Sequence, residues 1–319
     1  MRLVSFDRRG RPHVGGPRFG VRLPGTAELV DVELALEVLG DELAGTEPRD
    51  FREWFDLDGP WLPAAARTVS GLAASAASLD AARAAGAVES LSLVRLLAPV
   101  PRPGKIVCVG LNYRDHAAEA RLPVPESPVL FAKFPTAVVG PDTPIVLPLS
   151  SDRVDFEAEL AVVVGRRMKG VSPEEALAGV LGYTNANDVS ARDFQKLDGQ
   201  WVRSKSCDTF APLGPSVITA NEAGDPHGLR IQLRVNGQVM QDSSTDQLVF
   251  RVPDLLAFIA ETITLEPGDV VLTGTPPGVG FARRPPVFLR AGDVVEVEIG
   301  GFGCLRNPVT ATAPPDPDA

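Results

Sequence analysis

Three carboxylates alternate with apolar residues in the segment DFEAELAVVVG, which spans Asp155 to Gly165. If the segment is a β-strand, its period of two places Asp155, Glu157 and Glu159 on one face and the apolar side chains on the other. Carboxylates two residues apart on a strand lie roughly 7 Å apart. They repel one another unless a proton or a cation lies between them. The pattern favours a divalent-cation site, and a solvated strand face is the alternative.

A fourth acid, Asp188, follows an apparent strand in the segment YTNANDVSARDFQ. Carboxylate oxygens with no histidine nearby suit Mg²⁺ or Mn²⁺ better than zinc. The chain has three histidines, His13, His116 and His227, so a histidine-rich zinc site is nearly excluded. We therefore expect a magnesium or manganese site built from the acids of these two segments.

His116 and Glu119 stand three residues apart in NYRDHAAEARL, which makes them neighbours if that segment is helical. A carboxylate beside an imidazole orients the ring and raises its basicity, as a pair that activates water requires. By spacing alone, an exposed loop histidine with a chance acid is the better interpretation. Lys205, in WVRSKSCDTF, would by itself be taken for a surface lysine.

Two further motifs argue against other classes of enzyme. The glycine-rich loop TGTPPGVG, residues 273–280, lacks the Gly-Lys-Ser/Thr ending of a phosphate loop and does not match GxGxxG. A tight turn between strands would explain its glycines and Pro276 without any ligand. The chain also has no GxSxG motif, which disfavours a conventional serine hydrolase.

The elements that position these residues belong to the second part of the chain. The 319 residues are 44% hydrophobic and 23% charged, which is typical of a globular protein with one large and one smaller domain. Residues 1–100 predict a small α/β domain with strands at MRLVSF and RFGVRLPG and a helix at VDVELALEVLGDEL. An alanine-rich segment favours helix by propensity. The proline-rich stretch 96–105 predicts an extended linker and a boundary near residue 100.

Residues 101–310 predict a β-rich domain, because short β-like runs alternate with Gly, Pro and Asn turns. Two helices are expected within it. The first follows Ser172 and Glu175, which match a capping box with Pro173 at the first helical position. The second begins near Pro253. Residues 311–319 form a polar, proline-rich tail that we expect to be frayed.

Composition also limits the partners. The net charge of −10 without a basic tract disfavours nucleic acid, because phosphate binding requires a concentrated cationic face. No apolar run approaches the ~20 residues of a membrane helix, and the opening segment has no hydrophobic stretch of signal-peptide type. We expect a cytoplasmic protein with no membrane partner. The widely spaced Cys108, Cys207 and Cys304 predict neither disulfides nor a zinc knuckle.

Five motifs in order resemble the fumarylacetoacetate hydrolase superfamily over roughly residues 103–309. They are KIVCVGLNYRDHAAEA, DFEAELAVVVG, NDVSARDFQ, SKSCDTFAPLGP and LEPGDVVLTGTPPGVG. The resemblance implies a catalytic domain of the family's mixed β-sandwich roll, an α+β and β-rich fold, in a homodimer. It also implies Mg²⁺ or Mn²⁺ bound by a Glu-x-Glu pair and a later Asp, here Glu157, Glu159 and Asp188. Asp155 is placed by it behind the ligands rather than among them.

The same resemblance implies roles for the other polar residues. The pair His116 and Glu119 would lie on a segment that orders over the substrate and would activate a water molecule. Lys205 would point at the substrate, with Arg192 and Gln195 beside it as hydrogen-bond donors. Thr275 would hold a substrate carboxylate. Tyr113 would lie at the pocket edge or simply pack, and Lys133 is a weaker candidate for a substrate contact.

Together these features predict a divalent-metal-dependent hydrolase that cleaves a carbon–carbon bond in a small 1,3-diketo acid of the acylpyruvate or fumarylpyruvate type. The substrate would be a small anionic 2-oxo acid. The first alternative is an oxaloacetate decarboxylase or tautomerase, or a 2-hydroxy-diene-dioate isomerase, because the same metal site serves all of these reactions. A catalytically silent module that binds a metal or a sugar acid is the alternative from another class.

Overall fold

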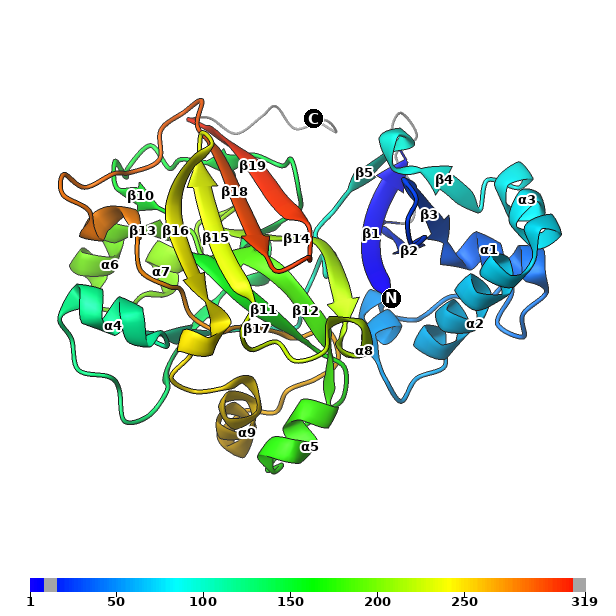
Figure 1. Ribbon diagram of the computed structural model, residues 1–319, viewed down its shortest axis with the longest axis horizontal. Coiled ribbons are helices and arrows are strands. Elements are labelled where there is room, and N and C mark those ends of the chain that lie inside the picture. The colour runs from blue at the N-terminus through cyan, green and yellow to red at the C-terminus, as the bar shows by residue number, and fades with distance from the viewer. Residues whose placement is uncertain (9–15, 312–319) are drawn as a thin grey trace.

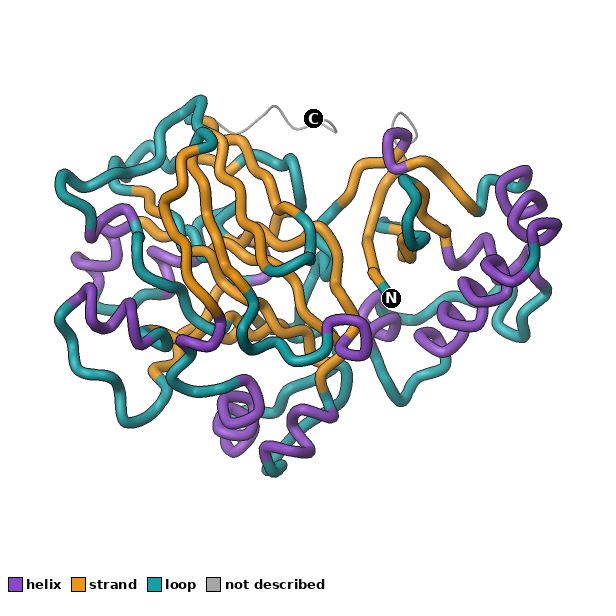
Figure 2. The backbone as a smooth tube through the Cα atoms, viewed as in Figure 1, coloured by secondary structure: helices purple, strands orange, loops and turns teal. Residues whose placement is uncertain are grey.

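The computed structural model describes residues 1–8 and 16–311 and shows a β-rich α+β fold. A twelve-stranded mixed sheet runs through the molecule, and a five-stranded sheet packs over part of it (Figure 1). The contacts of β11 (Ala158–Val164) with β15 (Arg230–Val235) and of β12 (Val180–Asn187) with β18 (Val294–Ile299) join the two layers. Helices lie around the strands rather than between them (Figure 2). The predicted fold class is confirmed.

The first hundred residues contribute strands to the same large sheet. Their strands are β1 (Arg2–Arg8), β2 (Arg18–Arg22), β3 (Glu28–Asp31), β4 (Val88–Ser90) and β5 (Val94–Leu96), and their helices are α1 (Val32–Leu39), α2 (Trp61–Ala74) and α3 (Ala76–Ala84), with short 3₁₀ helices η1 (Phe51–Phe55) and η2 (Leu91–Leu93). The sheet order is β4-β3-β2-β1, and β1 then pairs antiparallel with β14 (Ala211–Thr219). Backbone hydrogen bonds therefore cross the boundary near residue 100, and the domain division stays a prediction.

The second part of the chain supplies the remaining elements. The strands not yet named are β6 (Ile106–Gly110), β7 (Val129–Lys133), β8 (Val138–Val139), β9 (Ile145–Val146), β10 (Val154–Asp155), β13 (Ser190–Ala191), β16 (Gln238–Ser244), β17 (Val270–Leu272) and β19 (Cys304–Thr310). The helices are α4 (Arg114–Ala120), α5 (Pro173–Ala178), α6 (Arg192–Asp198), α7 (Val202–Lys205), α8 (Ala220–Ala223) and α9 (Val252–Thr262), with 3₁₀ helices η3 (Pro135–Ala137), η4 (Thr245–Gln247) and η5 (Gly280–Ala282). The large sheet continues from β14 as β12-β11-β17-β6-β7, and the smaller sheet runs β16-β15-β18-β19-β9.

Strand β11 is buried on both faces, which accounts for its apolar run from Leu160 to Val164. Leu160 and Val162 belong to the core between the two sheets. Ala161 and Val163 belong to a second core, which the first hundred residues complete with side chains such as Trp54. Glu159 has the parity of Ala161 and Val163, so it lies on the face of the sheet that points away from the five-stranded layer.

The predicted local signals have mixed outcomes. Ser172 and Glu175 form a capping box at the start of α5, and α9 begins at Val252, next to the expected Pro253. The alanine-rich segment forms α2 and α3. Strand DFEAEL is interrupted, because Phe156 and Glu157 lie between β10 and β11 rather than in either. The predicted frayed tail lies outside the described residues except for Ala311.

Candidate metal centre and active site

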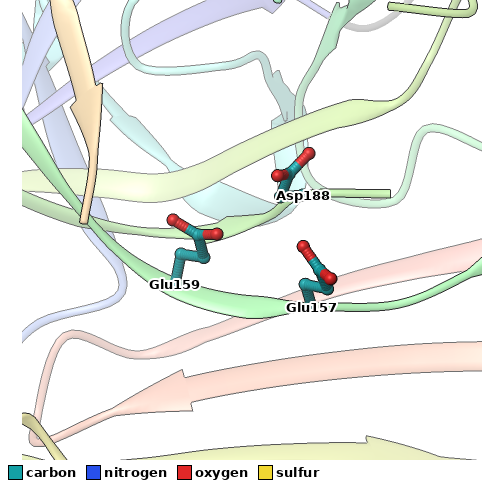
Figure 3. A group of neighbouring side chains, drawn as sticks. All are labelled: Glu157, Glu159 and Asp188. Carbon is teal, nitrogen blue, oxygen red and sulfur yellow. The ribbon is translucent and has the colours of Figure 1, made fainter. Parts of the chain in front are cut away.

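Two paired strands bring three carboxylates together. Glu159 lies on β11, and Glu157 is the residue before the start of that strand. Asp188 is the residue after the end of β12, and Asn187 at that end pairs with Ala158 of β11. The Asp188 N–H donates to the Glu157 carbonyl at 2.8 Å, which fixes the end of one strand against the other. One oxygen from each carboxylate lies within 4.8 Å of the other two, and all three side chains point toward one another (Figure 3). All three residues are buried.

Two buried lysines bind two of these carboxylates. The Lys205 ammonium donates to Glu157 Oε2 and to Asp188 Oδ2, each at 2.6 Å. The Lys133 ammonium donates to the other Asp188 oxygen at 2.5 Å and to the Val189 carbonyl at 3.2 Å. Both oxygens of Asp188 therefore have a cationic partner. Burial alone would lower the pKa of Lys205, but Asp188 and Glu157 outweigh it and raise that pKa above its ordinary value.

Arg192, at the start of α6, binds the remaining oxygen of Glu157. Its Nη2 donates to Glu157 Oε1 at 2.5 Å, its Nε to Asp155 Oδ2 at 2.9 Å, and its Nη1 to Gln195 Oε1 at 3.0 Å. The guanidinium carbon lies 4.3 Å from the centre of the Phe281 ring. Burial raises the pKa of Glu157, but the charges of Arg192 and Lys205 outweigh burial and hold it well below its usual value. Glu157 is therefore ionised and bound on both oxygens.

Glu159 differs from its two neighbours because no basic side chain among the described residues forms an ion pair with it. One hydrogen bond supports it, from the Gly274 N–H to Oε2 at 2.6 Å. Burial, together with the charges of Asp188 and Glu157, raises the pKa of Glu159 well above its usual value. A buried carboxylate that faces two other acids requires a proton or a cation. A metal ion between the three carboxylates would meet this need, which the ion pairs of Glu157 and Asp188 leave unmet.

The residues present fit a hard divalent cation. All three donors are carboxylate oxygens, which suit Mg²⁺ or Mn²⁺, and no histidine or cysteine belongs to the group. The buried charges also leave room for one. Four acids (the trio and Asp155) face three bases (Lys133, Lys205 and Arg192), so the set carries one net negative charge when every acid is ionised. A divalent ion would turn this into +1, which favours an anionic ligand.

The predicted pair His116 and Glu119 lies on the short helix α4. His116 Nδ1 is 3.3 Å from Glu119 Oε2. The Gly278 N–H donates to both oxygens of Glu119, at 3.0 and 3.2 Å. Asp115 binds Ser243 on β16 through a 2.5 Å hydrogen bond and so holds α4 from a second side. The imidazole therefore has an oriented carboxylate on Nδ1, and Nε2 has no protein partner among the described residues.

One loop, residues 274–281, supports the acids through its backbone. Its N–H groups donate to Glu159 from Gly274, to Glu119 from Gly278, and to Asp155 from Gly280 at 2.7 Å and Phe281 at 3.1 Å. A side chain at position 280 would place its Cβ 1.9 Å from the Val287 carbonyl oxygen and 2.5 Å from Asp155 Oδ1. Glycine is therefore required there by close packing. The loop therefore links the trio through Glu159, the His116 pair through Glu119, and Arg192 through Asp155, which we call the Arg192 anchor.

A cavity of about 180 Å³ opens onto these linked residues. Its wall includes seven of the residues predicted from the sequence: His116, Glu157, Glu159, Arg192, Gln195, Lys205 and Thr275. The Thr275 hydroxyl accepts a hydrogen bond from Gln241 Nε2 at 2.9 Å, and the Ala158 N–H donates to the same Gln241 side chain at 2.8 Å. Thr275 is therefore held at the wall by a buried amide on β16.

Four predicted residues do not line the cavity: Glu119 and Asp188, which bind residues that do, and Tyr113 and Lys133. Tyr113 is fully buried in the core between the sheets, and its hydroxyl has no partner within the described part of the chain. Its packing interpretation, rather than the pocket-edge one, matches this position. Lys133 is also fully buried and contacts Asp188 from behind, so the weaker expectation of a substrate contact does not match its position.

Several residues at the site gave no usable signal in the sequence. Gln241, Phe281 and Trp201 are single residues in ordinary surroundings, and no motif marks them. Asp155 was expected behind the ligands, and its hydrogen bonds to Arg192 and to the 274–281 loop describe how it lies there. Only the tertiary fold brings Gln241 to Thr275 at the cavity wall and Phe281 to the cavity itself.

The family model for the fumarylacetoacetate (FAA) hydrolase C-terminal domain matches residues 105–310. The chain belongs to this family. The mitochondrial oxaloacetate tautomerase of Xenopus laevis is 43% identical over 311 residues, which cover 97% of this chain and 90% of that protein. The human mitochondrial oxaloacetate tautomerase FAHD2A is also 43% identical over 311 residues, 97% of this chain and 91% of its own length. The family members with these names are enzymes.

Solved structures of the same family have the same fold. A 5-carboxymethyl-2-hydroxymuconate delta-isomerase from Mycobacterium smegmatis is 34% identical with a TM-score of 0.72, and 97% of this chain and 99% of that chain are covered. A fumarylacetoacetate hydrolase from Exiguobacterium antarcticum is 35% identical with a TM-score of 0.74, covering 98% of this chain and 100% of that one. The named reactions of these relatives differ, so the family alone does not select one reaction.

The expectation of a cytoplasmic protein is wrong on this comparison. The tautomerase relatives from Xenopus laevis, Bos taurus and Homo sapiens are named as mitochondrial proteins. The physical basis of that expectation was the absence of a recognisable apolar leader, and a composition of this kind does not distinguish the two compartments. Across residues 1–8 and 16–311, no helix is both long and apolar enough to cross a membrane.

Proposed function

We propose that the protein is a divalent-metal-dependent tautomerase that interconverts the keto and enol forms of a small 2-oxo acid, with oxaloacetate as the first candidate. The same proposal assigns Mg²⁺ or Mn²⁺ to Glu157, Glu159 and Asp188. It replaces carbon–carbon bond hydrolysis as the preferred reaction. The relatives that support it match over nearly the whole chain and are named oxaloacetate tautomerases.

The observation that carries the proposal is the placement of a base and an acid on one small cavity. His116 and Lys205 both line the cavity of about 180 Å³ onto which Glu157 and Glu159 open. Tautomerisation moves one proton between a carbon and an oxygen of the same molecule, so it requires a proton acceptor near the carbon and a donor near the oxygen. It requires no attacking water and no space for a leaving group. The small cavity suits such a reaction.

When bound, Mg²⁺ or Mn²⁺ supplies Lewis-acid polarisation of the carboxylate and 2-oxo oxygens of the substrate. His116 takes a proton from carbon 3 through Nε2, because Nδ1 is engaged with Glu119. The Glu119 carboxylate stabilises the imidazolium that results, and the Gly278 N–H keeps that carboxylate in place. In the reverse direction the imidazolium returns the proton to carbon 3.

Lys205 acts on the 2-oxo oxygen. Its raised pKa keeps it protonated, because Asp188 and Glu157 hold the ammonium between them. The ammonium stabilises the negative charge that develops on oxygen 2 as carbon 3 loses its proton, and it donates a proton to that oxygen to complete the enol. The His116 imidazolium then releases its proton to water, and Lys205 takes one up from water. Arg192, Gln195 and Thr275 line the same cavity and offer hydrogen bonds to substrate carboxylates.

The test is to follow the decay of freshly dissolved enol oxaloacetate by its ultraviolet absorbance. We expect the metal-loaded protein to accelerate equilibration of the enol and keto forms and His116→Ala to lower turnover by roughly 10²- to 10⁴-fold, the usual contribution of a general base. Carbon dioxide and pyruvate are measured in the same samples, because decarboxylation would also consume the enol. A metal-loaded protein that leaves the uncatalysed rate unchanged would refute the proposal.

A second candidate is hydrolysis of an acylpyruvate. The His116–Glu119 pair supports it, because an oriented imidazole can equally remove a proton from water. Hydrolysis would release pyruvate and a carboxylic acid from acetylpyruvate, which chromatography detects directly. Stoichiometric release of both products, with no acceleration of oxaloacetate tautomerisation, would favour this candidate over the tautomerase.

A further inference from the structure

One aromatic side chain lies on the cavity with no role in the chemistry described above. Trp201 precedes α7, the helix that carries Lys205, and its indole lines the same cavity. The Trp201 carbonyl accepts hydrogen bonds from the Lys205 N–H at 3.0 Å and from the Ser204 hydroxyl at 2.7 Å. The backbone of Trp201 is therefore fixed by the same turn that positions Lys205.

The indole is also held firmly by its neighbours. It packs on Gly110 at the end of β6, where an added Cβ would lie 3.0 and 3.2 Å from two indole carbons. Its ring meets the ring of Phe131 edge to face, with centroids 5.2 Å apart. A larger residue at position 110 would force the indole to move. Gly110 and Phe131 thus hold the indole in one position.

The lining of the cavity combines charged and apolar side chains. The charged part of the lining is Glu157, Glu159, Arg192 and Lys205, and the apolar part is Val109, Leu111, Leu122, Phe131, Trp201 and Phe281, the last of which lies over the Arg192 guanidinium. A 2-oxo acid whose carboxylate and oxo group bind the charged part must direct its far end elsewhere. Within about 180 Å³, a longer chain would meet the apolar part.

We propose that Trp201 determines substrate length and restricts the enzyme to short 2-oxo acids of about the size of oxaloacetate. The proposal rests on the proposed function, because it assumes that a 2-oxo acid binds through its carboxylate and oxo group. Removing the indole opens space beside Gly110 and Phe131, the two residues against which the ring packs. The enlarged cavity accepts a 2-oxo acid with a longer apolar chain, such as an acylpyruvate with an extended acyl group.

A competing role for Trp201 is to position Lys205. The Lys205 ammonium lies 5.1 Å from the centre of the Phe131 ring, and Phe131 contacts Trp201. Loss of the indole could therefore act on the ammonium through Phe131. Such an effect would lower turnover of short and long substrates by the same factor. A change in the ratio of their kcat/KM values identifies a length-determining residue instead.

The experiment compares the wild-type protein with Trp201→Ala and Trp201→Phe, all loaded with Mg²⁺. Enol–keto interconversion is measured for oxaloacetate, acetylpyruvate and hexanoylpyruvate. We expect Trp201→Ala to raise the hexanoylpyruvate-to-acetylpyruvate ratio of kcat/KM by about 10-fold or more, since a single methylene group in a pocket is worth at least about that much. Trp201→Phe should lie between the two proteins. Leu197→Ala is the matched control, because Leu197 is on the adjacent helix α6, is 79% exposed and does not line the cavity.

Binding measured by calorimetry separates this inference from the proposed function. Affinities of oxalate and hexanoylpyruvate for the Mg²⁺-loaded proteins need no turnover. If the wild-type protein shows no tautomerase activity but Trp201→Ala improves the affinity for hexanoylpyruvate relative to oxalate about 10-fold, the function fails and the length restriction stands. The inference is overturned if neither Trp201 variant changes the hexanoylpyruvate-to-acetylpyruvate ratio of kcat/KM and turnover of all substrates falls by the same factor.

Discussion

Replacing Glu159 by Gln should stabilise the metal-free protein while weakening its metal binding. Glu159 is the carboxylate of the trio without a basic ion-pair partner among the described residues. Glutamine keeps an oxygen that can accept the Gly274 hydrogen bond and removes the negative charge. The substitution therefore tests whether the Glu159 charge destabilises the metal-free protein and serves only to bind the cation.

The spacing of the oxygens sets the magnitude. Unit charges 4.8 Å apart repel by about 3.5 kcal/mol at an effective dielectric constant of about 20. Glu159 faces two acids, Glu157 and Asp188, and the Lys205 ammonium between those two offsets about one of them. The remaining repulsion of about 3.5 kcal/mol is partly relieved when Glu159 takes up a proton. We expect Glu159→Gln to raise the free energy of unfolding of the metal-free protein by about 1–3 kcal/mol.

Metal affinity should change in the opposite direction. In the wild-type protein a bound cation relieves the same repulsion. Glu159→Gln has no such repulsion to relieve, so the variant loses about 3.5 kcal/mol of metal-binding free energy. This corresponds to a roughly 300-fold increase in the Kd for Mg²⁺ or Mn²⁺, because each 1.4 kcal/mol is tenfold. Metal binding to the wild-type protein should also tighten as pH rises, because Glu159 has a raised pKa and must lose its proton to bind a cation.

The pH dependence of the free energy of unfolding tests the same charge independently. The folded-state pKa of Glu159 lies above its unfolded value, so this group contributes stability below the unfolded pKa and loses it as pH rises through the folded pKa. The stabilisation by Glu159→Gln should therefore be largest at high pH and disappear in acid. Glu157 has the opposite shift, and its contribution is present above its unfolded pKa and lost as pH falls toward its folded pKa.

Urea unfolding of chelator-treated protein over a range of pH provides the assay, and calorimetry provides the metal affinity. Glu157→Gln is the matched control, because Glu157 is bound by Arg192 and Lys205. Breaking a buried ion pair on one side costs about 3–5 kcal/mol, so this control should destabilise the protein. Equal destabilisation by the two substitutions would refute the assignment of Glu159 as the uncompensated charge.

Three further predictions concern catalysis, the metal and assembly. Glu119→Gln should lower turnover in the same direction as His116→Ala, and the double variant should lose no more than the stronger single variant, because the two residues act as one unit; steady-state kinetics of all three checks this, and additive losses would contradict it. Exhaustive chelation should abolish activity and lower the melting temperature, with Mg²⁺ or Mn²⁺ restoring both; full activity after chelation would exclude a metal-dependent reaction. The homodimer implied by the family resemblance should appear in light scattering at micromolar concentration as twice the chain mass, and a monomeric mass would contradict it.

Local patterns in the sequence predicted much of the fold and of the acid cluster. The alternation in DFEAEL depends only on the two-residue period of a strand, and Phe156, Ala158 and Leu160 do share one core. The capping box at Ser172 depends on four consecutive residues. Features that depend on a few neighbouring residues can be predicted from the local sequence. The break at Phe156 and Glu157 was missed, because the Glu157 N–H donates to the Asn187 side chain at 3.0 Å, a partner thirty residues away.

Charge compensation could not be predicted from the sequence. From the sequence, Lys133 is a weaker candidate for a substrate contact, whereas in the structure its ammonium binds Asp188 from the buried side. Nothing within the segment LFAKFPTA shows this, because Lys133 lies on β7 and Asp188 follows β12, and several strands of the sheet lie between them. A lysine and an aspartate distant in sequence become partners only through sheet order. Trp201 and Gly110 are likewise distant in sequence and pack directly against each other at the cavity wall.

The 274–281 loop connects the acids of the site through its backbone. The loop donates hydrogen bonds from backbone N–H groups, which every residue except proline has. The sequence TGTPPGVG therefore does not indicate which acids the loop binds. The glycines allow the loop to approach the acids closely, as the space at position 280 demonstrates. Because one segment binds Glu159, Glu119 and Asp155, a displacement of this loop would disturb the metal site, the imidazole pair and the Arg192 anchor together. Residues that differ in chemical role are thus coupled through a single stretch of backbone, and single substitutions among them should not have additive effects.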